Sequence, residues 1–166
     1  MDKVTPSLLA ELKSSYLFKD FSNEELEAVL HMARRESVTT GHSVLAGDRD
    51  GESFCFIHFG SLRTQLAGPQ GEVTALNLIG TGAILGAASL VTTLPRLMDA
   101  EAVEQTELFV FDKKALESYF VDHPETAVKF YRSMSAHLAH TLQMTMQELA
   151  EVRETSYLEK HGLSSL

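Results

Sequence analysis

Glycines, small residues and one arginine gather between positions 78 and 102, the stretch of this sequence with the clearest chemical potential. Gly80, Gly82 and Gly86 precede a run of small residues, and Arg96 follows a proline. Small residues at the start of a helical turn let backbone N–H groups approach a phosphate, and the helix dipole favours the anion there. A guanidinium adds a planar fork that binds two phosphate oxygens. The pattern indicates an anion site; turn glycines beside a solvated arginine are the alternative.

The composition is that of an ordinary globular domain with an acidic surface. The chain has 166 residues, of which 44% are hydrophobic and 22% are charged, and its formal net charge is −9. This length predicts one domain with a substantial core. The acidic balance argues against a nucleic-acid partner, because that binding depends on neutralising phosphates with Lys and Arg.

The sequence carries no export or membrane signal. Residues 1–6 lack a basic segment followed by an apolar one, and no run approaches the roughly 18 apolar residues that a bilayer span requires. We therefore expect a cytoplasmic protein without a membrane partner. The single cysteine, Cys55, lies within the apolar run Phe54–Ile57, so we expect it to be buried in the core.

Three zones of patterning follow one another along the chain. The first carries two helix-start signals, Thr5 followed by proline, and Ser22 with Glu25 three residues later. The second consists of short strand-like runs separated by Gly-rich turns, which predicts an antiparallel β-roll or jelly-roll barrel. The expected class is mainly β with flanking helices. The expected divisions are 5–33 for short N-terminal helices, 34–112 for the β-roll, 113–156 for C-terminal helices and 157–166 for a tail.

A long helix with an apolar stripe is predicted over 124–156. At about 1.5 Å per residue it would measure about 45 Å. The stripe has spacings of four and three residues, close to a heptad repeat. Because such a helix is longer than the β region, we expect a homodimer in which its far end packs against a second copy; packing on its own β region alone is the alternative. The stripe comprises Ala127, Tyr131, Met134, Leu138, Thr141, Thr145, Leu149 and Val152.

The order of elements and several motifs resemble the cyclic nucleotide-binding domain of the catabolite activator and protein kinase A regulatory-subunit families. Residues 56–62 resemble the family's apolar strand, glycine and following strand. Residues 78–86 resemble the turn that leads into its phosphate-binding cassette, and the cassette spacing matches without a gap over 86–102. The similarity covers about residues 5–156.

This resemblance implies roles for the cassette residues. Arg96 would pair with the cyclic phosphate of cAMP or cGMP. The backbone amides of Ala88 and Ser89 would bind the same phosphate, and Gly86 would leave room for the sugar. No metal or further cofactor is implied. Ligand binding would change the position of the long helix through differential affinity for two states.

Other positions of the implied site include departures from the family. The long helix would close over the base, with Thr141 or Thr145 binding its edge. Ala87 stands where the family has a glutamate for the ribose hydroxyl, and Leu97 stands where it has a small or hydroxyl residue. Asp99 adds a negative charge that would either face solvent or compete for the arginine. A lost hydrogen bond to a charged acceptor costs about 1.5–3 kcal/mol, which weakens binding roughly ten- to more than a hundredfold.

Two functions therefore remain open. One is a regulatory module that senses cAMP or a related phosphorylated ligand and signals through its dimer helix. The other is a degenerate member that no longer binds cyclic nucleotide and acts as a dimeric protein-interaction module. Only about ten residues follow Ser156, too few for a DNA-reading domain, so we expect the output to pass through dimerisation or a partner protein.

Enzymatic function is not indicated. A cupin-type metal centre needs two or three histidines and a carboxylate on neighbouring strands, whereas the strands offer only His42 and His58, without a His-x-His pair. His137 and His140, three residues apart on the long helix, could share a metal at a dimer seam, but a solvated or interfacial pair is the commoner arrangement. We expect a protein without catalytic residues.

Overall fold

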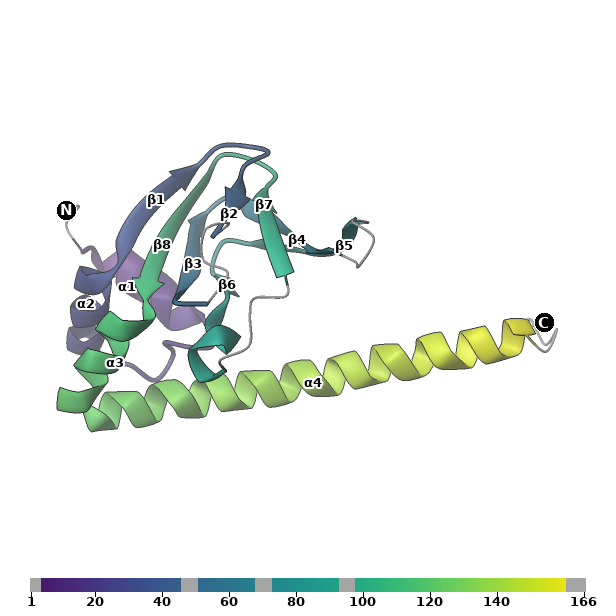
Figure 1. Ribbon diagram of the computed structural model, residues 1–166. Helices are drawn as coiled ribbons and strands as arrows, with labels where there is room; N and C mark the ends of the chain where they lie inside the picture. Colours follow the sequence, from purple (N-terminus) through teal and green to yellow (C-terminus); the bar gives the residue numbers. More distant parts are fainter. Residues whose placement is uncertain (1–3, 46–50, 68–72, 93–97, 161–166) are drawn as a thin grey trace.

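The chain folds into two four-stranded sheets flanked by helices from both ends of the sequence. The computed structural model describes residues 4–45, 51–67, 73–92 and 98–160. Figure 1 shows the last helix running below the sheets and extending well past them. The elements are α1 (Pro6–Ser14), α2 (Asn23–Met32), β1 (Arg34–Val38), β2 (Ser43–Val44), β3 (Ser53–Phe59), β4 (Ser61–Ala67), β5 (Val73–Gly80), β6 (Ile84–Leu85), the 3₁₀ helix η1 (Ala87–Val91), β7 (Met98–Ala102), β8 (Thr106–Asp112), α3 (Lys113–Asp122) and α4 (Pro124–Lys160).

Both sheets are antiparallel, as the sequence predicts. The strand orders are β1-β8-β3-β6 and β2-β7-β4-β5. The expected mainly β class with flanking helices is confirmed, but within the described residues the two sheets do not close into a barrel. The sequence did not reveal β6 as a strand, because two residues are too few to show a period.

Successive side chains of β3 point alternately into two different hydrophobic cores. Cys55 and Ile57 belong to the core between the two sheets, and both are fully buried. Phe54 and Phe56 belong to a second core, which the helices cover. The period of two places neighbouring side chains on opposite faces of the strand. The expectation that Cys55 is a core residue is therefore confirmed.

Aromatic rings hold the helices against the sheet. Phe54 of β3 and Phe111 of β8 stack with ring centroids 4.9 Å apart. Phe18, from the connector between α1 and α2, lies 5.6 Å from Phe111. Phe130 of α4 lies 6.2 Å from Phe54 and is fully buried. The first part of α4 is thus part of the domain core.

The predicted caps of the N-terminal helices are confirmed. The Oγ1 of Thr5 accepts a hydrogen bond from the Leu8 amide at 3.2 Å. Ser22 and Glu25 form a capping box, in which the Ser22 amide donates to Glu25 Oε2 at 2.6 Å and the Glu25 amide donates to Ser22 Oγ at 3.2 Å. Each cap satisfies backbone donors that have no partner within the helix.

Glu25 also connects α2 to α4. Its carboxylate accepts from Lys129 Nζ at 2.8 and 2.9 Å and from Thr126 Oγ1 at 2.6 Å. Burial alone would raise the pKa of this carboxyl, but the hydrogen bonds from Lys129, Thr126 and the Ser22 backbone, together with the Lys129 charge, lower it. The ionised form of Glu25 therefore stabilises the packing of α4 on α2.

Among the described residues, none of the helices combines the length and apolar character of a membrane span.

The long helix α4 ends at Lys160, slightly beyond the predicted end near Ser156. Helix ends are less sharply defined by sequence than helix interiors, because no glycine or proline stops this helix at Ser156.

Replacing Gly60 by alanine should destabilise the protein by about 2–5 kcal/mol, from left-handed strain plus overpacking. Gly60 has φ +90°, and an added Cβ would lie 2.6 Å from Thr106 Oγ1 and 2.7 Å from the Gln105 carbonyl oxygen. Gly41→Ala is the matched control, because Gly41 has φ +83° but no neighbour within 4 Å of an added Cβ. Urea unfolding should show the smaller loss for Gly41→Ala; equal losses would contradict the crowding argument.

Glu25→Gln should lower the free energy of unfolding at pH 7 by about 1–3 kcal/mol, because it removes charge-assisted hydrogen bonds. A lowered pKa stabilises the folded state above the unfolded pKa, so the wild type should lose this contribution as the pH falls from about 5 through the lowered value. Glu25→Gln should lose less stability over that range. Glu27→Gln removes the same charge from the exposed side of α2 and should behave as wild type in urea titrations across pH.

Candidate functional site

The predicted cassette begins with a glycine turn held against the central strand β3. After β5, the Gly82 amide donates to the Ile57 carbonyl at 2.8 Å, and β6 then pairs with β3. Gly82 and Gly86 have φ of +85° and +88°, conformations that strain any residue with a Cβ. Gly86 is the N-cap of η1, so the small residues of the cassette do open a helical turn.

The structure brings only part of the predicted site together. Gly86, Ala87 and Ala88 lie in sequence at the start of η1, and Ser89 follows them in the same turn. Arg96 and Leu97 lie outside the described residues. Of the phosphate site predicted from the sequence, the structure therefore describes the backbone turn, and the role of Arg96 stays a prediction.

Ala87 is a buried core residue rather than an exposed cassette residue. Its exposure is 5%, and it belongs to the same hydrophobic cluster as Leu90, Phe130 and Met134. Ala88, by contrast, is exposed. Since η1 also contacts α4, the cassette turn and the long helix share one packed core. Sequence reasoning placed Ala87 in the site but did not reveal this inward packing.

Asp99 faces solvent. It lies opposite Gln65 in the register of β7 with β4, and it is exposed. Its neighbour Ala100 is 1% exposed and belongs to the core between the sheets. Alternation along β7 thus directs the Asp99 carboxylate away from the interior. Of the two possibilities raised by the sequence, the solvent-facing one holds.

The middle of α4 is fastened to the connector between α1 and α2. Ser133 Oγ donates to Asp20 Oδ2 at 3.3 Å, and the rings of Tyr16 and His137 stack with centroids 3.6 Å apart. Burial raises the pKa of Tyr16 to about 12. Burial, and then the nearby His140, lower the pKa of His137, so the stack favours the neutral imidazole. No local sequence signal could have paired these residues.

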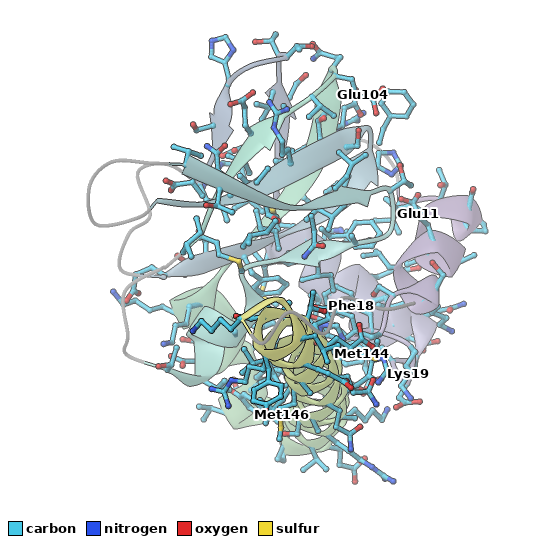
Figure 2. The ribbon with its side chains drawn as sticks, turned by 90° about the vertical axis from the view of Figure 1, so that its right-hand side faces the viewer. Glu11, Phe18, Lys19, Glu104, Met144 and Met146 are labelled. Atoms are coloured by element: carbon cyan, nitrogen blue, oxygen red, sulfur yellow. The ribbon has the colours of Figure 1, made fainter. Side chains whose placement is uncertain are left out.

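Beyond Leu138, the side chains of α4 are largely exposed to solvent. Leu142, Leu149 and Val152 are 61%, 49% and 64% exposed. Figure 2, which looks towards the C-terminal end of α4, shows Met144 and Met146 projecting from different sides of the helix. Thr141 and Thr145, the predicted contacts to a base, are also exposed on this half.

The apolar stripe of α4 is covered by the domain up to Leu138 and exposed beyond it. Its first half, with Tyr131 and Met134, packs against the domain. At about 100° per residue, Leu142 lies about 20° from Leu149 and Thr141 lies about 20° from Val152, so the two positions flank the stripe equally. The steps from Thr141 to Thr145 and from Thr145 to Leu149 are both four residues, so the predicted stripe contains one stutter in its heptad spacing.

The two histidines considered for a metal centre, His42 between β1 and β2 and His58 in β3, have different partners. His42 Nδ1 lies 2.8 Å from Thr39 Oγ1, and His58 Nδ1 lies 3.0 and 3.1 Å from the carboxylate oxygens of Glu11. Across the part of the chain that the structure describes, no group of three or more His, Cys, Asp or Glu side chains is arranged to hold a metal ion.

Comparison with known proteins agrees with this geometry. The chain is 24% identical over 136 residues to a CRP-like cAMP-activated global transcriptional regulator of Mycobacterium tuberculosis. That alignment covers 82% of this chain and 59% of the relative, so the chain spans less than two thirds of the length of the curated relative.

Solved structures share the fold. The catabolite activator protein of Thermus thermophilus has a TM-score of 0.69 at 24% identity, with 84% of this chain and 63% of that chain covered. The N-terminal domain of a transcriptional regulator from Streptomyces coelicolor A3(2) has the same TM-score at 19% identity, with 79% and 94% covered. The regulatory domain of Toxoplasma gondii PKA with cAMP has a TM-score of 0.61 at 18% identity, with 70% and 46% covered.

The sequence model of the cyclic nucleotide-binding domain matches residues 35–123, which span the β-sandwich, the cassette turn and α3. The match covers more than half of the chain, and it includes the described turn at Gly86. The chain therefore belongs to the cyclic nucleotide-binding domain family, whose members serve as ligand-sensing regulatory modules.

Proposed function

We propose that this chain senses cAMP or a related phosphorylated ligand through Arg96 and transmits the binding event through α4. The observation that carries the proposal is the turn at Gly86, whose left-handed conformation opens η1 beside the packed core of the domain. Family membership and the cAMP-related descriptions of the relatives support it. The proposal places residues 1–166 in a single domain, with 157–166 as its tail.

The phosphate would bind at the start of η1. The amides of Ala88 and Ser89 lie in its first turn, after Gly86, where a helix has donors without internal partners. Arg96 would supply the permanent charge, because the backbone alone offers only partial charges. A short 3₁₀ turn is a weak anion site by itself, so the arginine decides the affinity.

The sugar would be recognised less well than the phosphate. The Ala87 methyl group packs into the core with Leu90, so this position offers no acceptor for a ribose hydroxyl. We therefore expect weaker binding than in family members with a glutamate there, and tolerance of changes at the ribose. Thr141 and Thr145 remain candidate contacts for the base, in case α4 closes over it.

Transmission would pass through the shared core. Leu90 of η1 lies in the same cluster as Phe130 and Met134 of α4. A ligand that holds η1 in one position therefore favours the position of α4 that packs best against it. This is a shift between two states by differential contact, and it needs no covalent step.

A dimer through the second half of α4 would receive the signal. Leu142, Thr145, Leu149 and Val152 form an exposed line that a second copy could cover. The alternative function, a dimeric protein-interaction module without ligand, is favoured by one observation, the buried methyl group at Ala87. The two functions differ in ligand binding and share the dimer.

Calorimetric titration with cAMP and cGMP tests the sensor. We expect saturable binding at submillimolar concentration and a loss of about a hundredfold or more for Arg96→Ala, which removes a bidentate charged contact. Arg132→Ala, on the exposed side of α4, is the charge-matched control and should bind as wild type. Absence of binding by either nucleotide would leave the interaction module as the function.

Leu149→Asp should dissociate the proposed dimer, because it puts a charge into the apolar seam. Light scattering should give about twice 18.3 kDa for the wild type and the monomer mass for Leu149→Asp. Val128→Asp makes the same kind of change at a 66% exposed position away from the stripe and should leave the dimer intact. A wild-type mass near 18.3 kDa would refute the seam.

A further inference from the structure

A cavity of about 400 Å³ lies between α1, the end of α2 and the helix-facing side of the first sheet. Its volume falls within the range of small-molecule sites, about 300–1,000 Å³. None of its lining residues belongs to the cassette stretch 78–102. It is therefore separate from the proposed nucleotide site, and a ligand there would be a second one.

The register of the strands and the position of α1 create this cavity. Arg35 of β1 and Phe109 of β8 lie opposite each other in the register of the two strands, and both line the cavity. Leu8 of α1 and Leu30 of α2 add apolar walls. The partly buried Leu8 and Phe109 pack against the core that the helices cover, so the cavity lies at the edge of that core.

The charges in the cavity favour a cation. Arg35 is paired with Glu107 at 2.5 Å. The Glu11 carboxylate, whose side chain is 22% exposed, has His58 as its partner at 3.0 Å. An imidazole offers a hydrogen bond to that carboxylate but no permanent charge. Figure 2 shows Glu11 on the edge of α1 that lies beside the strands.

We propose that this cavity binds a small organic ammonium ion, a protonated amine that carries an apolar group of about one ring. The ammonium group would pair with Glu11, and the apolar group would lie against Leu8, Leu30 and Phe109. The Phe109 ring would add a cation–π contact. The formal net charge of −9 raises the local concentration of cations.

Other ligand charges fit less well. An anion would meet the Glu11 carboxylate and could reach Arg35 only in competition with Glu107. A neutral apolar molecule would remove water from Glu11 without supplying a counter-charge, which is costly. An amine both compensates the carboxylate and covers the apolar walls.

Three probes of matched shape and different charge test the proposal by two-dimensional amide NMR. The wild-type protein is titrated with 2-phenylethylamine, 2-phenylethanol and phenylacetate. We expect saturable shifts of amide signals around Leu8, Glu11 and Phe109 with the amine, and affinities lower by about tenfold or more for the alcohol and the acid. Equal binding of the alcohol, tighter binding of phenylacetate, or no saturable shift with the amine would overturn the proposal.

Variants separate the carboxylate from the general acidity of the protein. Glu11→Gln keeps an oxygen that can accept from His58 but removes the charge, and should weaken amine binding about tenfold or more. Glu148→Gln removes the same charge from the exposed part of α4 and should bind as wild type. Unchanged binding by Glu11→Gln, with its spectrum still dispersed, would refute the carboxylate as the recognition group. Arg96→Ala should leave amine binding unchanged, so the outcome is independent of the nucleotide site.

Discussion

The structure depends on the packing of α4 into the aromatic core beneath the first sheet. Phe130 is fully buried among rings contributed by the N-terminal connector, β3 and α3. Leu90 of the cassette turn belongs to the same cluster. Protein interiors are packed as densely as organic crystals, so a shift of one member must be taken up by its neighbours. The cassette, the sheet and the long helix therefore cannot move independently.

Local sequence signals predicted much of this fold, whereas contacts between distant segments were beyond them. The Thr5 cap, the Ser22–Glu25 capping box and the burial of Cys55 follow from neighbouring residues, and all are present. The pairing of Glu25 with Lys129 joins residues 104 positions apart. No pattern within one helix reveals its partner across such a distance.

The candidate site likewise has features that the sequence predicted and features that it could not predict. Glycines at positions 82 and 86 could be assigned to a tight turn, because their left-handed backbone is one that other residues adopt only with strain. The inward packing of Ala87 could not be predicted, since alanine is common both in cores and on surfaces. The stripe of α4 shows a related limit, because Thr141 and Leu142 are both exposed and flank it equally. Spacings of three and four fit a helix equally well until a neighbour fixes which face is covered.

For the proposed dimer through the second half of α4, the free energy gained by burial is similar in size to the free energy cost of association. A helix that extends from its domain gains little stability from propensity alone, so its exposed half needs a covering surface. Covering Leu142, Leu149 and Val152 of both copies would contribute about 6–9 kcal/mol, at about 1–1.5 kcal/mol for each half-exposed side chain. Association costs about 4–15 kcal/mol in lost freedom. The gain falls within the range of that cost, so the contacts that the first half of α4 shares with η1 would shift the proposed equilibrium in either direction. A balance of this kind would suit a regulatory module better than a permanent assembly, because small contacts at the cassette could then decide the state of the far end.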